Sequence, residues 1–188
     1  MLAGELRGRG FDLITTCEPG GTPLGRHLRR AFLETEETVS PLAELLLFAA
    51  DRAQHVEFLI RPAIAAGRIV VSDRYADATA AYQGAGRGFE PELVQKVIDI
   101  ATGGLSPDLT IFFDIPVDVA IDRMARRHEQ ESTRNRMDRE TAEFYGKVRA
   151  EYLKIAKREP NRFRLVDGSN AVDEVHSAVL DIVIDALG

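Results

Sequence analysis

Four short runs of apolar residues are spaced along the chain, and each predicts a buried β-strand. Each run is nearly continuous in β-branched or aromatic side chains, which is the pattern of a parallel strand covered on both faces of its sheet. The four runs are Phe11–Thr16, Ile69–Asp73, Leu109–Asp114 and Phe163–Asp167. They therefore indicate the strands of one parallel sheet.

The segments between and after these strands have the periodicity of helices. Ser40 and Pro41 form an N-cap and first-turn pair that begins a long helix, which ends near Ala66 with Gly67 beyond it. The other periodic segments are Glu92–Ala101, Val117–Arg127, Thr141–Lys157 and Val172–Leu187. Strands that alternate with helices predict an α/β fold with a parallel sheet covered on both sides. No repeat or linker divides the chain, so we expect a single domain over residues 1–188.

The composition is that of a globular protein, with 45% hydrophobic and 29% charged residues. No apolar run approaches the length of about 18 residues that a membrane-spanning helix needs, and the first residues lack the apolar stretch of a signal peptide. The formal net charge of −6 gives no electrostatic basis for non-specific binding to nucleic acid. We therefore expect neither a membrane nor a nucleic acid as a partner.

Cysteine usage points to a reducing compartment. The only cysteine, Cys17, cannot form a disulfide within the chain, and no Cys/His cluster has the spacing of zinc ligands. The expected location is therefore the cytoplasm.

Three of the predicted strands end in aspartate, at Asp73, Asp114 and Asp167. Ligands of open parallel sheets bind at the carboxyl ends of the strands, so these carboxylates are placed for function. Aspartate is also a common turn residue, and this structural interpretation is favoured for Asp114 and Asp167. Asp73 differs because Arg74 and Tyr75 follow it directly, before a polar and glycine-rich segment.

Two short motifs precede that segment. Residues 18–22 read EPGGT, and two glycines after a strand allow close approach to a ligand, although by itself the motif favours an ordinary Pro-Gly turn. Phe48 and Arg52 lie one turn apart on the long helix, so a ring and a guanidinium share a face that could bind a flat base. The alternative places Phe48 in the core and pairs Arg52 with an acid, and by itself the motif favours that alternative.

Two later segments carry more chemistry. Residues 73–88, DRYADATAAYQGAGRG, combine an acid with Arg74, Gln83, Arg87 and three glycines, which is more than a structural loop requires. A functional interpretation is therefore favoured there. The segment Arg123–Asp138 interleaves arginines with acids, which indicates either a solvated face or a lid that closes over phosphates.

Taken together and in this order, these motifs closely resemble those of bacterial thymidylate kinases. The resemblance extends from about Leu2 to the C-terminus, and it is carried by EPGGT, FAADR and DRYADATAAYQGAGRG, followed by SPDLTIFFD, RMDRETAEFYGKVRAEYLKIA and NRFRLVD. It implies a three-layer α/β/α fold of the P-loop-kinase type. It also implies transfer of the γ-phosphoryl group of ATP to dTMP with Mg²⁺, in the supply of dTTP, by a homodimer.

The resemblance also implies roles for individual residues on the nucleoside side. Phe48 would stack on thymine, Arg52 would contact a base carbonyl, and Gln83 would bind the base edge. Thr79 stands where the family often has a small hydroxyl residue. Tyr82 would lie under the deoxyribose and exclude a 2′-hydroxyl.

On the phosphate side, the resemblance makes Arg74 and Asp73 the catalytic residues. Arg74 would hold the acceptor phosphate, and Asp73 would orient it or belong to the Mg²⁺ shell. Arginines and Mg²⁺ are the expected groups, because phosphoryl transfer depends on positioning and on neutralisation of phosphate oxygens. The family assigns further side chains to the phosphates and to a lid over about residues 123–140, namely Glu18, Arg134 and Arg136.

One family motif is missing. The phosphate-binding sequence G-x-x-x-x-G-K-[ST] occurs nowhere in the 188 residues. Met1–Arg7 matches the later part of the helix that follows this loop in the family, so we expect the sheet to lack its usual first, central strand. Cys17 is a smaller departure, since it stands where the family often has arginine.

These departures leave the activity of the chain as written open. Either the natural protein begins upstream of Met1, which we favour, or the chain is a truncated relative. The alternatives to dTMP phosphorylation are a non-catalytic protein that binds dTMP or another nucleotide, and a kinase of a different deoxynucleoside monophosphate.

Overall fold

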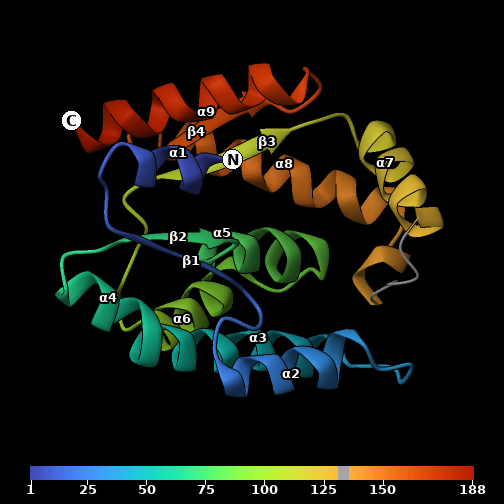
Figure 1. Ribbon diagram of the computed structural model, residues 1–188. Helices are drawn as coiled ribbons and strands as arrows, with labels where there is room; N and C mark the ends of the chain where they lie inside the picture. The colour runs from blue at the N-terminus through green and yellow to red at the C-terminus, as the bar shows by residue number, and fades with distance from the viewer. Residues whose placement is uncertain (131–135) are drawn as a thin grey trace.

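A computed structural model describes residues 1–130 and 136–188 (Figure 1). Helices alternate with four short strands along the chain, and three of the helical segments are π or 3-10 turns. In order these elements are α1 (Leu2–Gly8), β1 (Leu13–Cys17), α2 (Pro23–Leu33), α3 (Pro41–His55), η1 (Val56–Ile60), α4 (Arg61–Ala65), β2 (Ile69–Asp73), α5 (Ala76–Thr79), η2 (Ala80–Gly86), α6 (Pro91–Thr102), β3 (Thr110–Asp114), α7 (Val117–Gln130), η3 (Arg136–Arg139), α8 (Ala142–Arg158), β4 (Phe163–Asp167) and α9 (Val172–Leu187).

The strands confirm the predicted α/β class with parallel pairing. β2 and β4 have the predicted bounds, β1 is shifted toward Cys17, and β3 begins one residue later than predicted. β1 pairs with β2 and β3 pairs with β4, and both pairs are parallel. Within the described residues these are two separate two-stranded sheets, with no strand between β2 and β3. A single sheet with an absent central strand stays a prediction.

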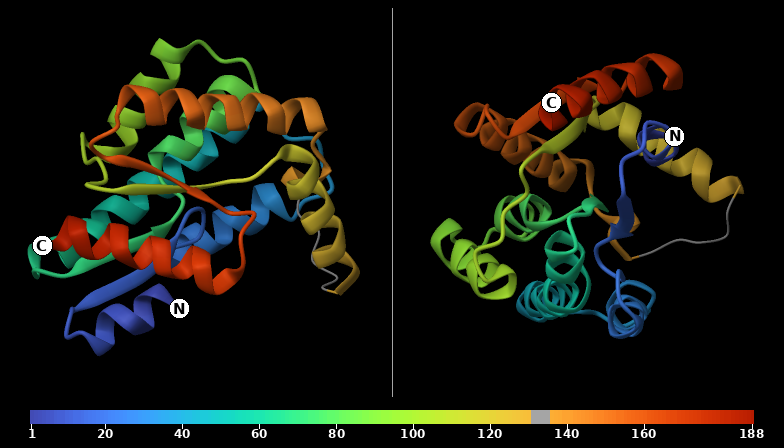
Figure 2. Two further views of the ribbon diagram at one scale, coloured as in Figure 1. Left: turned by 90° about the horizontal axis from the view of Figure 1, so that it is seen from above. Right: turned by 60° about the vertical axis from the view of Figure 1, so that its left-hand side comes forward.

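Helices cover both faces of the strand pairs. On one face α1 packs on β1, α9 packs on β4, and the two helices contact each other. On the other face α4 packs on β2, while α8 contacts both β4 and η2. Figure 1 shows α1 and α9 together at the top and α2, α3, α4 and α6 gathered at the bottom, and Figure 2 shows the same elements from two other sides. No helix in the described part of the chain is long and apolar enough to cross a membrane.

The two strand pairs are joined by a polar bridge and by aromatic packing. Asp77, on α5 after β2, accepts two hydrogen bonds from Arg162, at 2.8 and 2.7 Å, and one from the Thr110 hydroxyl at 2.8 Å. The rings of Phe112 on β3 and Tyr152 on α8 stack with centroids 4.4 Å apart. Because α8 also packs on η2, this helix connects the second strand pair to the segment that follows β2.

Three helical segments were not expected from the sequence, and the shortest of them is the 3-10 turn η3. The α2 helix begins at Pro23, and the Thr22 hydroxyl caps it by accepting from Gly25 N at 3.0 Å. The same kind of signal predicted the helix that begins at Ser40 and Pro41, so α2 could have been found.

The second unexpected helical segment, α5 with η2, covers Ala76–Gly86 and lies inside the glycine-rich segment. A Cβ on Gly86 would lie 2.6 Å from the Phe144 ring, so glycine lets α8 pack closely there. Tertiary packing therefore overrides the low helix propensity of glycine.

Candidate functional site

A small pocket, with a cavity volume of about 10 Å³, opens beside α3 and η2. All six residues expected to bind the acceptor nucleotide line it, although they come from three separate segments. Its lining consists of Glu18, Phe48, Arg52, Arg74, Ala78, Thr79, Tyr82 and Gln83. The fold therefore gathers the residues singled out in the sequence into one site.

Two aromatic rings form flat walls of the pocket. Phe48, on α3, meets the ring of Phe32 edge-on, with centroids 4.9 Å apart at 75°. Tyr82, on η2, lies under the guanidinium of Arg74, whose central carbon is 4.8 Å from the ring centroid, and its other neighbour is Phe144 at 6.0 Å. Flat walls of this kind suit a planar base and a sugar.

Arg52 and Glu18 form a buried ion pair behind these walls. The Nε of Arg52 donates to one Glu18 oxygen at 2.8 Å, and the other oxygen bonds His55 Nδ1 at 2.8 Å. Both side chains of the Arg52–Glu18 pair are only 2% exposed. This placement differs from the phosphate-side position expected for Glu18, because both of its oxygens already have protein partners.

The pairing of Arg52 with an acid, which the sequence left as an alternative, is therefore correct, and Arg52 nevertheless lines the pocket. It also donates to the Thr79 hydroxyl at 2.7 Å and to the Tyr75 carbonyl at 3.1 Å. A guanidinium has five N–H groups, so two are left for a ligand.

His55 explains the second glycine of the EPGGT motif, Gly21. Its Nε2 lies 2.7 Å from the Thr16 hydroxyl. A Cβ on Gly21 would lie 2.5 Å from that nitrogen and 2.6 Å from the Thr16 oxygen. The close approach that we expected toward a ligand is therefore made at Gly21 by His55. Sequence reasoning missed this histidine, although it lies three residues after Arg52 on the same helix.

Asp51 is a buried acid next to this network. One carboxylate oxygen accepts from Gly20 N at 3.1 Å, and Oδ2 has no hydrogen-bond partner in the described part of the chain. Burial, followed by the negative charge of Glu18, raises the pKa of Asp51 to about 6. Near neutral pH the site therefore contains a carboxyl group close to its titration point.

Glu44, at the start of α3, is a second buried carboxylate that the sequence analysis missed. It accepts from Gln83 Nε2 at 2.9 Å, from Arg87 Nε and Nη2 at 3.0 and 2.9 Å, and from Arg136. Burial alone would raise the pKa of Glu44, but hydrogen bonds from Arg87, Gln83 and Arg136 outweigh it and lower that pKa. Arg136 also donates to the Phe32 carbonyl at 3.2 Å. It is therefore bound to protein groups here, rather than extended over a phosphate site.

The remaining expected residues lie near the strand ends. Asp73 and Arg74 are exposed directly after β2, and Arg74 has the unusual backbone angle φ 69°. Asp114 forms an ion pair with Arg149 at 2.6 Å, and Asp167 accepts from the Ser169 backbone N–H at 2.8 Å. These contacts agree with the interpretation of Asp114 and Asp167 as structural residues, which the sequence favoured.

The lid is described only in part. Arg134 lies outside the described residues, as do the other residues of 131–135 within the expected lid over about residues 123–140. From residue 136 the described chain continues with η3, and Arg136 at its start donates a hydrogen bond to Glu44.

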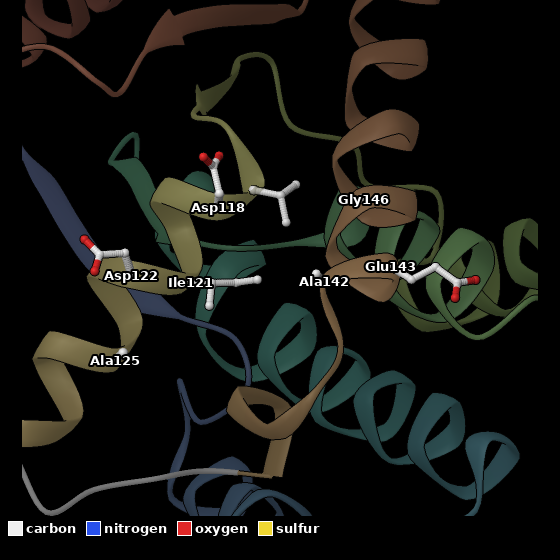
Figure 3. Close-up of a pocket in the computed structure, with 8 residues that line it drawn as sticks. Asp118, Ile121, Asp122, Ala125, Ala142, Glu143 and Gly146 are labelled. Carbon is white, nitrogen blue, oxygen red and sulfur yellow. The ribbon is translucent and has the colours of Figure 1, made fainter.

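A larger, mostly open hollow with a volume of about 850 Å³ lies between α7 and α8 (Figure 3). Its walls are apolar, including Val117 and Ile121, and its charged side chains are the acids Asp118, Asp122 and Glu143. Acids disfavour the phosphates of a nucleotide, and none of the expected site residues lines this hollow. The smaller pocket is therefore the candidate site.

The fold and the pocket together define an α/β nucleotide-binding protein of the P-loop-kinase type. Residues 1–179 match the family described as Thymidylate kinase. The thymidylate kinase of Thermomicrobium roseum is 46% identical over 187 residues, which cover 100% of this chain and 87% of that protein. The thymidylate kinase of Geotalea uraniireducens is 42% identical over 190 residues, which cover 100% of this chain and 89% of that protein.

A crystal structure of thymidylate kinase from Ehrlichia chaffeensis is similar in fold, with a TM-score of 0.74 and 29% identity. The similarity covers 96% of this chain and 84% of that one. The chain belongs to the thymidylate kinase family, whose members are enzymes of the nucleoside monophosphate kinase class.

Asp51→Asn should change the pH dependence of stability. Because the folded state raises the pKa of Asp51 to about 6, the folded protein retains this proton when the unfolded chain has lost it, and stability falls as the pH rises between the two values. The asparagine side chain does not titrate. The free energy of unfolding of the variant, minus that of the unaltered chain, should therefore rise by about 3 kcal/mol between about pH 4 and about pH 6. Urea unfolding at several pH values measures this, and a difference that is constant with pH contradicts it.

Proposed function

We propose that this chain takes part in the phosphorylation of dTMP to dTDP with ATP as donor. The observation that carries the proposal is the single pocket that gathers Phe48, Arg52, Arg74, Tyr82 and Gln83, with Thr79 behind them. An aromatic wall, two cations and an amide form a site for a flat base attached to an anionic phosphate. The role of each residue is the one that the family resemblance implies.

In this reaction an oxygen of the dTMP phosphate attacks the γ-phosphorus of ATP, and the bond to the β-phosphate oxygen breaks to leave dTDP and ADP. Arg74 neutralises the acceptor phosphate beside the Tyr82 ring. Arg134 and Arg136 belong to the lid over the ATP phosphates. Arg136 must leave Glu44 to reach them, so this role requires the segment to move.

Magnesium fits the carboxyl end of β2. Mg²⁺ is usually held by one or two carboxylates together with water and substrate phosphates, and Asp73 is an exposed carboxylate next to Arg74. Within residues 1–130 and 136–188 there is no group of three or more His, Cys, Asp or Glu side chains that could hold the ion by themselves. Asp73 is therefore the residue that would hold Mg²⁺, which would supply positive charge to the phosphate oxygens.

The specificity of the pocket can be tested by calorimetric titration of the chain with dTMP, dUMP, dCMP and dGMP. We expect dTMP to bind most tightly, and to bind more tightly than its ribonucleotide analogue because the role proposed for Tyr82 is to exclude a 2′-hydroxyl. Tyr82→Ala should narrow the deoxyribose preference by about tenfold. Equal affinity for all four nucleotides overturns the proposed substrate, whereas an unchanged sugar preference in the variant removes only the role of Tyr82.

The 188 residues do not contain the sequence G-x-x-x-x-G-K-[ST], which bears on phosphoryl transfer by the chain as written. That loop supplies backbone N–H groups and a lysine to the donor phosphates, and loss of one preorganised donor can cost about 10²–10³ in rate. We therefore expect negligible turnover from the 188-residue chain.

Steady-state assays with ATP and dTMP measure this turnover, using protein purified free of host kinase. Addition of a strand and a phosphate-binding loop before Met1 should restore both turnover and melting temperature. Turnover of about 1 s⁻¹ or more from the chain as written, in the ordinary range of enzymes, contradicts the expectation.

We further propose that the chain forms a homodimer through its helical layer. Large exposed apolar side chains lie on the long helix, at Leu46 and Phe58, and on α6, at Ile100, which is 83% exposed. α3 and α6 contact each other, so these side chains belong to one layer of the fold. A second copy of the chain would cover them.

Light scattering should therefore give twice the monomer mass, and Ile100→Glu should lower the mass toward the monomer. Val172→Glu is the matched control, because Val172 is 69% exposed on α9 in the opposite layer. A monomeric mass for the unaltered chain overturns the dimer.

A further inference from the structure

Glu44 joins the nucleotide pocket to two arginines outside it. Its side chain is fully buried, and its two oxygens accept hydrogen bonds from Gln83, Arg87 and Arg136. Gln83 lies on η2, Arg87 directly follows η2, and Arg136 begins η3, so these segments and α3 meet at one carboxylate. Of these partners only Gln83 lines the pocket.

The charge of Glu44 determines which way the Gln83 amide faces. Two guanidinium groups donate to Glu44, and an ionised carboxylate can only accept hydrogen bonds. The NH₂ group of Gln83 must therefore face Glu44, because its oxygen would meet another acceptor there. No described residue donates to Gln83 Oε1, which is the atom left for a ligand.

We infer that Glu44 determines base specificity by holding the Gln83 amide with its oxygen toward the base. This inference rests on the proposed binding of dTMP in the pocket. Glu44 would not touch the nucleotide, so it is a positioning residue that acts through Gln83.

The chemistry of the bases makes this orientation selective. Thymine and uracil carry an N–H at N3, which donates to the fixed oxygen of Gln83. Cytosine has an unprotonated N3, so two acceptors would face each other and both would lose their water. An amide free to rotate by 180° could bind either edge equally well. The fixed amide thus selects bases with an N3–H.

Arg87 and Arg136 keep this arrangement in place. A buried carboxylate without cations would tend to take up a proton, and a protonated Glu44 could donate to Gln83 and allow the reverse orientation. Arg87 is itself held by Glu140 at 2.6 Å and by the Phe144 ring, 4.8 Å from its guanidinium carbon. The arginines therefore stabilise the ionised form that orients Gln83.

The test compares dTMP and dCMP binding to the full chain and its variants by calorimetry. Glu44→Gln should lower the preference for dTMP over dCMP at least tenfold, because its amide can donate to Gln83 Oε1 and permit rotation. Glu44→Asp should largely retain the preference, because aspartate still only accepts. Glu140→Gln is the matched control: it removes a carboxylate from Arg87 but does not touch Gln83, so the preference should stay within about twofold.

A double variant separates specificity from general damage to the site. If Glu44 acts through Gln83, Glu44→Gln should not change the dTMP-to-dCMP ratio further once Gln83→Leu is present. In the unaltered chain, dTMP methylated at N3 should bind at least tenfold more weakly than dTMP, which tests the oxygen of Gln83 even if Glu44→Gln does not fold.

The outcomes are distinct. An unchanged ratio in Glu44→Gln, or undiminished binding of N3-methylated dTMP, overturns the inference and leaves the proposed function intact. No preference for dTMP in the unaltered chain overturns the proposed function and the inference together.

Discussion

The pocket depends on one buried carboxylate, Glu18, which is held between Arg52 and His55. A charge can remain in the interior only when its partners are complete, and removal of one partner from a buried pair costs about 3–5 kcal/mol. Arg52 also bonds Thr79 and the Tyr75 carbonyl. The loop after β1, the helix α3 and the segment after β2 are therefore held in one arrangement, and the residues that line the pocket are carried by these same segments.

Glu44 is a second buried carboxylate with arginine partners, and it lies beside Gln83 of the pocket. Like Glu18 it is buried and paired with arginine, but its two arginines, Arg87 and Arg136, do not line the pocket. Glu18 thus holds the guanidinium of Arg52, and Glu44 holds the amide of Gln83. Polar groups that line the pocket are thus held in place by buried carboxylates, which keeps the cost of ordering low when a ligand binds.

Much of the fold and the site could be predicted from the sequence because local patterns decided them. Apolar runs placed four strands to within two residues, and the Ser40-Pro41 cap placed the start of α3. The α5–η2 helix could not be predicted, because it depends on Phe144 packing against Gly86 from a distant helix. The pairing of strands into two separate sheets is likewise a property of the folded chain.

For the site, the sequence by itself determined which residue types are present and that they resemble one family, since motif and spacing are local properties. Only the tertiary structure decided that Glu18 is a buried partner of Arg52, that His55 fills the space left by Gly21, and that Glu44 faces Gln83. These contacts join residues 34 to 39 positions apart. Their energies depend on burial and on direct contact, and neither is set until distant segments pack together.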